Sequence, residues 1–104
     1  MIPETEILDR LQRLFVSATR FEQKGGSKAP GLRAKMAVQY LENGNLDAAS
    51  RAIINSENEM RAHELRELAM KIPSGETHRD ALVAIFQQNY SLAEELIIAA
   101  GVLD

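Results

Sequence analysis

The sequence predicts an all-α protein, and three observations lead to this prediction. Apolar residues recur at spacings of three and four over most of the chain, which places them on one side of successive helices. No stretch alternates apolar and polar residues with the period of two that a half-buried strand requires. Glycine and proline occur in short clusters between the periodic stretches. We expect five or six helices forming a compact bundle of antiparallel helical hairpins in one domain, residues 1–104.

The composition agrees with a small globular domain and excludes several kinds of chemistry. Of the 104 residues, 45% are hydrophobic and only 5% aromatic, so leucine, isoleucine, alanine and methionine must build the core. The chain has no cysteine, which excludes disulfides, thiolate metal ligands and a cysteine nucleophile. No apolar run approaches the roughly 20 residues of a membrane span, and the first residues lack a signal-peptide pattern. We therefore expect a cytoplasmic protein without a membrane partner.

The first predicted helix covers residues 4–23, and Pro3 suits its start. Its apolar stripe is Ile7, Leu8, Leu11, Leu14, Phe15, Ala18 and Phe21. This single stripe must pack on the same chain or on a second copy, so a homodimer is one expectation. Residues 24–31 contain three glycines and one proline and predict a loop. Because the phosphate-loop pattern G-x-x-x-x-G-K-[ST] is absent, we interpret this loop as a flexible connector.

A helical hairpin is predicted over about residues 32–55, with its turn at Gly44 and Asn45. Glycine suits the position after a helix, and asparagine caps the next helix. Residues 46–72 contain no glycine or proline, so they form either one helix or two. Ser56 and Glu59 fit a capping box, which favours a bend and a separate helix over about residues 57–72.

The last predicted hairpin covers about residues 78–100, after a firm stop at Pro73-Ser74-Gly75. Thr77 with Asp80 fits a cap at its first helix, and Ser91 to Glu94 fits a capping box at its second. The first helix of this hairpin has Ala81, Leu82, Ile85 and Phe86 on one side.

The two hairpins show an internal similarity. Residues 37–56 align with residues 81–100 at an offset of 44, and both segments read as helix, short polar turn and helix. The identical pairs are Ala37/Ala81, Asn45/Asn89, Ala49/Ala93, Ile53/Ile97 and Ile54/Ile98. Small residues at helix crossings let backbones approach closely, so this pattern predicts a repeated helical hairpin.

The first hairpin resembles a tetratricopeptide repeat over residues 30–63. With Pro30 as the first of 34 positions, the matching residues are Met36, Ala37, Tyr40, Gly44, Leu46, Ala49 and Ile53. Arg33 and Arg61 depart from the family pattern, which has an aromatic residue and a proline there. In the second hairpin Tyr90, Ala93, Ile97 and Ala100 fit, whereas Gln88 replaces the glycine. Any close-packed helical hairpin selects similar residue types, so this alternative stays open.

The resemblance implies a protein-binding role. Such hairpins present a groove to a helix or an extended peptide, and small proteins of this type occur among chaperones of bacterial secretion systems. The candidate groove residues are Tyr40, Phe86 and Tyr90, for which core packing is the alternative role.

The net charge of −3 conceals an uneven distribution. Residues 1–35 carry a net charge of +3, and residues 36–104 carry −6. The residues that could contact phosphates or an acidic partner are Arg20, Lys24, Lys28, Arg33 and Lys35. Nucleic-acid binding by segment 20–35 is therefore the alternative function. The acidic chain and the lack of interleaved aromatics weigh against it.

The sequence contains no catalytic or metal-binding motif. Glu59, His63 and Glu67 lie four residues apart and could share a helix face, but the metal motif H-E-x-x-H is absent. Ser74, His78 and Asp80 are sequence neighbours, whereas catalytic triads assemble from distant segments, so capping is the expected role of His78. We expect a non-enzymatic interaction module with no cofactor, no catalytic residue and no metal ligand.

Overall fold

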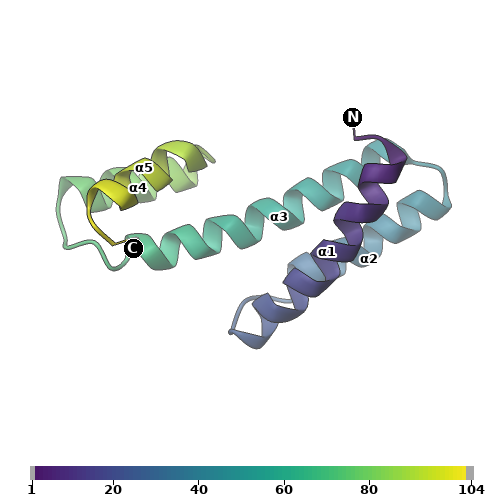
Figure 1. The fold of residues 1–104 in the computed structure, drawn as a ribbon, viewed down its shortest axis with the longest axis horizontal. Coiled ribbons are helices and arrows are strands. Elements are labelled where there is room, and N and C mark those ends of the chain that lie inside the picture. The colour runs from purple at the N-terminus through teal and green to yellow at the C-terminus, as the bar shows by residue number, and fades with distance from the viewer. Residues whose placement is uncertain (1, 103–104) are drawn as a thin grey trace. The chain divides into compact units, whose positions relative to one another are not determined.

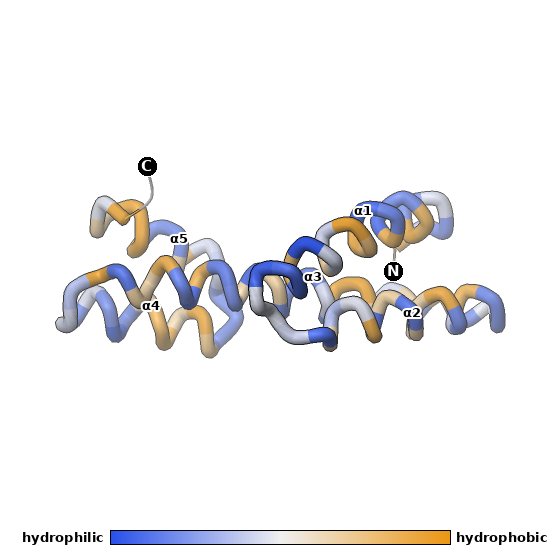
Figure 2. Tube along the Cα trace, turned by 90° about the horizontal axis from the view of Figure 1, so that it is seen from below, coloured by the Kyte–Doolittle hydropathy of each residue, from blue (hydrophilic) through white to orange (hydrophobic). Residues whose placement is uncertain are grey.

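The computed structural model describes residues 2–102, and these residues form five α-helices and no strand (Figure 1). The helices are α1 (Glu4–Gln23), α2 (Ala29–Glu42), α3 (Leu46–Ala69), α4 (Glu76–Phe86) and α5 (Tyr90–Ala99). The all-α prediction is confirmed for these residues, and their five helices agree with the expected five or six. Hydrophobic and hydrophilic residues both occur along the helices (Figure 2), and spacings of three and four gather the hydrophobic ones on one side of a helix.

The chain divides into two compact units, the first ending at Met60 and the second beginning at Arg61. The first unit contains α1, α2 and the beginning of α3, and the second contains the end of α3 with α4 and α5. Each unit has its own hydrophobic cluster. The expectation that residues 1–104 form one folding domain stays a prediction.

Helix α1 buries most of the stripe that the sequence predicted. Its buried residues are Ile7, Leu11, Leu14, Ala18 and Phe21, which follow one another at spacings of four and three. Leu8 and Phe15 were expected in this stripe but are 54% and 37% exposed. Each lies one residue beyond a buried position, and one residue rotates a side chain about 100° around the helix axis.

The core of the first unit joins α1 to α2 and α3 through small side chains. Its buried residues are Ile7, Leu11, Leu14, Ala34, Ala37, Ala49, Ala52 and Ile53. Every buried residue from α2 in this cluster is an alanine, so the backbone of α2 approaches its neighbours closely. The leucines and isoleucines of α1 and α3 fill the remaining volume.

Helix α2 begins at Ala29, within the segment expected to be a loop. Pro30 occupies the first turn, where its missing N–H group has no helical partner to lose. The loop before it is tight at Gly26, whose amide donates to the Phe21 carbonyl at 2.9 Å. A Cβ atom on Gly26 would lie 2.3 Å from the Phe21 ring, so only glycine fits there.

Helix α3 runs without interruption from Leu46 to Ala69, so the break expected near Asn55 and Ser56 is absent. Ser56 does not begin a helix. Its side chain is fully buried, and its hydroxyl donates to the carbonyl oxygens of Ala52 at 3.0 Å and Pro30 at 3.1 Å. A serine that is buried and hydrogen-bonded inside a helix gives the same sequence pattern as a serine that caps a helix. The prediction of a capping box at Ser56 is therefore wrong.

The core of the second unit is built by the end of α3 with α4 and α5. Its buried residues are Ala62, Leu65, Ala69, Ile72, Ala81, Ala84, Ile85, Ala93 and Ile97. Two expected caps are wrong: α4 follows Gly75 with no side-chain cap, and α5 is capped by Asn89 instead of Ser91. Asn89 satisfies the amide of Leu92, so Ser91 falls inside the first turn.

The internal similarity corresponds to a repeated turn geometry. The amide of Asn45 donates to the Tyr40 carbonyl at 2.8 Å, and the amide of Asn89 donates to the Ala84 carbonyl at 2.8 Å. This bond closes a left-handed helix end, which needs a positive φ at the preceding residue. Gly44 has φ of 73°, and Gln88 adopts nearly the same value, 61°.

Burial accounts for most of the identical residue pairs. The six residues Ala37, Ala49, Ile53, Ala81, Ala93 and Ile97 are each 0% exposed. The side-chain oxygen of each asparagine accepts a hydrogen bond from the amide three residues later. The distance is 3.1 Å from Ala48 to Asn45 and 3.4 Å from Leu92 to Asn89. Among the apolar pairs, only Ile54 and Ile98 are exposed, so these two residues have no role in either core.

Replacing Gln88 with glycine should stabilise the protein by about 1 kcal/mol, because a side chain in the left-handed region costs about that much. The matched variant Gly44→Ala should destabilise it by a similar amount. Urea unfolding followed by circular dichroism measures both changes. A loss of stability in Gln88→Gly would contradict the proposed equivalence of the two turns.

Candidate functional site

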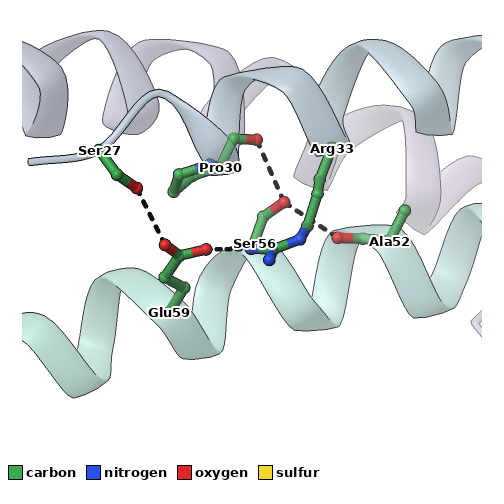
Figure 3. A network of polar contacts seen from close by, with 6 residues as sticks. All are labelled: Ser27, Pro30, Arg33, Ala52, Ser56 and Glu59. Atoms are coloured by element: carbon green, nitrogen blue, oxygen red, sulfur yellow. Dashed lines mark hydrogen bonds and ion pairs between the residues drawn. The ribbon is translucent and has the colours of Figure 1, made fainter.

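A polar network links α3 to α2 and to the loop before α2 (Figure 3). The carboxylate of Glu59 accepts a hydrogen bond from the Ser27 hydroxyl at 2.9 Å and also from the Arg33 guanidinium. The Arg33 and Glu59 side chains are 38% and 30% exposed, so the pair is partly shielded from water. Arg33 thus holds α2 on α3 and has its charge compensated within the first unit.

The other residues of the basic segment lie on the surface. Arg20, Lys24, Lys28 and Lys35 are all exposed. The Lys28 ammonium lies 4.0 Å from the Glu22 carboxylate, a loose contact. The other three form no ion pair within the described residues. Of the five cations expected to contact phosphates or an acidic partner, three remain uncompensated.

An open hollow of about 300 Å³ lies between α1 and the first part of α3. Its lining residues are Glu6, Arg10, Arg13, Leu14, Ser17, Glu57 and Met60. Arg10 donates to Glu57 across the hollow, and Arg13 pairs with Asp9 at 2.9 Å. Because both arginines are already paired, this hollow offers no free cation for an anionic ligand.

The three aromatic candidates lie in different environments. Tyr40 and Tyr90 are half-buried and pack against the cores of the first and second units, respectively. The Arg61 guanidinium lies 5.4 Å from the centre of the Tyr90 ring and pairs with Glu94 at 2.5 Å. Phe86 is 89% exposed, so core packing does not explain this residue.

The two histidines make local contacts. His63 Nε2 lies 3.0 Å from Glu67, while the Glu59 carboxylate is engaged by Arg33. No group of three potential metal ligands occurs among the described residues. His78 Nδ1 lies 2.9 Å from the Ala69 carbonyl oxygen. Because a carbonyl only accepts, Nδ1 carries the proton, and His78 caps the end of α3 instead of the start of its own helix.

Helix α4 exposes a second apolar side opposite its buried one. Ala81, Ala84 and Ile85 face the core, whereas Val83 and Phe86 are 47% and 89% exposed. Leu92 is 41% exposed in the first turn of α5, so it lies with Phe86 beside the turn at residues 87–89. We call these three residues, with the exposed carboxylates of Glu76, Asp80 and Glu95, the α4–α5 surface.

The sequence interpretation found Phe86 but missed Val83 and Leu92. A signal for Val83 was available, because residues 81–86 are six consecutive apolar residues. One buried helix side uses only about half of such a run, so the remainder must face water or a partner. The signal at Leu92 is misleading, because Leu92, Leu96 and Ala100 follow one another at spacings of four and so predict a buried stripe.

Comparisons with known proteins identify no relative. No protein-family model, curated protein or solved structure matches the chain. Within the described residues, no helix has the length and apolarity needed to cross a membrane.

Two buried serines provide a matched test of the polar network. Ser56→Ala should destabilise the protein by about 1 kcal/mol, because its hydroxyl bonds two carbonyls. Ser50 is 5% exposed, and its hydroxyl has no partner among the described residues. Ser50→Ala should therefore be neutral or stabilising. Thermal unfolding distinguishes these effects, and equal destabilisation by both variants would refute the assignment.

Proposed function

We propose that this protein is a non-enzymatic helical interaction module that binds a partner protein through the α4–α5 surface. The observation that carries the proposal is the exposure of Phe86, at 89%, on the same side of α4 as the exposed Val83 and six residues before the exposed Leu92. Contiguous exposed apolar groups mark interaction sites in soluble proteins, and single apolar side chains scattered over a surface do not. Aromatic residues at the centre of such sites supply much of the binding free energy.

The repeated hairpin supports this proposal. Both copies bury two alanines and one isoleucine completely, which makes each hairpin a rigid platform. We propose that these hairpins are antiparallel, form a compact bundle and are of the tetratricopeptide type, as the pattern over residues 30–63 suggests. A rigid platform loses little conformational entropy on binding, so more of the apolar contact contributes to affinity.

The proposed partner segment is an apolar helix or extended peptide. A mainly apolar surface with carboxylates at its margin suits a partner that combines apolar and basic residues. A protein of this kind would act as an adaptor or as a chaperone-like protein that shields an aggregation-prone segment of its partner. Small chaperones of bacterial secretion systems provide the model for this role.

Nucleic-acid binding by residues 20–35 is the second candidate. The favouring observation is that Arg20, Lys24 and Lys35 are exposed and uncompensated. Arg33 is held by Glu59, which reduces the number of cations available for phosphates. Phosphate contacts weaken steeply as salt rises, whereas apolar contacts do not. Binding retained at high salt would therefore exclude this candidate.

Replacing Phe86 with alanine should weaken partner binding strongly while the fold stays intact. Because the side chain is 89% exposed, its removal should change the free energy of unfolding by less than about 0.5 kcal/mol. Loss of a central aromatic contact should weaken binding by about 2 kcal/mol, roughly 30-fold. A photo-crosslinking residue at position 86 captures the partner, and titration of the purified partner measures the affinity.

The matched control is Met70→Ala. Met70 is also a large exposed apolar residue of the second unit, but it lies outside the α4–α5 surface. This variant should bind the partner as the wild type does. Equal binding by Phe86→Ala and the wild type would exclude the α4–α5 surface as the binding site.

A further inference from the structure

We propose that the partner bound by the α4–α5 surface is a second copy of this chain, which docks through a basic surface on α1 and α2. The inference rests on the proposed function, because it names the protein that the α4–α5 surface binds. Two surfaces of the same chain combine exposed apolar side chains with uncompensated charge, and their charges are opposite.

The basic surface consists of two helical stripes. Its residues are Val16, Arg20 and Lys24 on the α1 side, and Leu32, Lys35 and Met36 on α2. Spacings of three and four place the members of each stripe on one side of their helix. The two helices meet through their buried sides, where a Cβ atom on Gly31 would lie 4.0 Å from the Ala18 side chain, and the two stripes lie on the outer sides of α1 and α2. Val16, Leu32 and Met36 are each about half exposed, which provides apolar contact area beside the cations.

Internal ion pairs leave the basic surface charged. Arg33, which lies in the same segment, is paired with Glu59 and does not contribute. Arg20, Lys24 and Lys35 form no ion pair within residues 2–102. The surface therefore presents three free positive charges around its apolar residues.

The α4–α5 surface retains the opposite charge. Glu94 is paired with Arg61 and is not available. Glu76, Asp80 and Glu95 form no ion pair among the residues described, and Arg79 provides a single exposed positive charge nearby. Three carboxylates and one guanidinium leave a net charge of −2 beside Val83, Phe86 and Leu92.

Charge determines which surfaces of two copies meet. Two α4–α5 surfaces repel each other, as do two basic surfaces, so a symmetric contact between identical faces is disfavoured. Contact between the acidic surface of one copy and the basic surface of the next is favoured. A single contact of this kind leaves one surface of each kind unoccupied. Assembly therefore ends when the contacts close on themselves, in a reciprocal dimer or a larger ring, and otherwise continues as an open filament.

Charge reversal tests the proposal. The acid-reversed variant combines Glu76→Lys, Asp80→Lys and Glu95→Lys, and the base-reversed variant combines Arg20→Glu, Lys24→Glu and Lys35→Glu. Sedimentation velocity and light scattering follow the average mass of each full chain as concentration rises, at low and at high salt. The wild type should associate, less so at high salt, and each variant should associate at least tenfold more weakly.

An equimolar mixture of the two variants should regain association, because each reversed surface then faces its complement. Circular dichroism establishes that both variants retain their helices, since all six positions are exposed and unpaired. The control variant combines Asp47→Lys with Arg51→Glu, which reverses one exposed charge of each sign on α3, outside both surfaces. This control should associate as the wild type does.

A wild type that stays monomeric at every concentration and at low salt would overturn the self-association proposal. Reversed variants that associate normally, or a mixture that fails to regain association, would also overturn it. If the wild type is monomeric and Phe86→Ala loses a different captured protein, the proposed function stands and only the second copy is excluded. If Phe86→Ala affects neither self-association nor capture of another protein, both proposals fail.

Discussion

Close contact between small buried side chains is the constraint on which both units depend. Ala37 and Ala49 in the first unit, and Ala81 and Ala93 in the second, are completely buried. A larger residue at any of these positions would separate two helix backbones and displace the isoleucines packed beside them. The turns with positive φ at Gly44 and Gln88 end α2 and α4 with the same hydrogen bond and are followed within two residues by the next helix.

The sequence allowed prediction of the helices, the repeat and most buried positions, because periodic apolar residues report burial directly. It did not reveal the start of α2 or the continuity of α3, because proline and serine each have two opposite uses. Pro30 can end a helix or open one, and Ser56 can cap a helix or lie buried in its middle with its hydroxyl bonded across to α2. Only the neighbouring helix decides between them. The same reason explains Arg33, whose partner Glu59 lies 26 residues away and could not be inferred from local spacing.

The candidate surface was harder to predict than the core. An apolar run that exceeds one helix side indicates an exposed surface only once the buried side is known, so the sequence alone does not separate Phe86 and Val83 from core residues. The charge asymmetry of the sequence has two structural origins. Part of it forms internal pairs within the first unit, Arg10 with Glu57 and Arg33 with Glu59. The remaining charges are exposed beside apolar side chains, with positive charges in residues 20–35 and negative charges in residues 76–95. Charges in such positions can select and orient a partner.

The positions of Tyr40 and Tyr90 have a practical consequence for studies of folding. The chain has no tryptophan and only these two tyrosines. One packs against the first core and the other against the second. Tyrosine emission therefore contains one signal from each unit, and a phenylalanine substitution at either position isolates the other. Comparison of the two single-tyrosine proteins would establish whether the units lose their structure at the same denaturant concentration or in sequence.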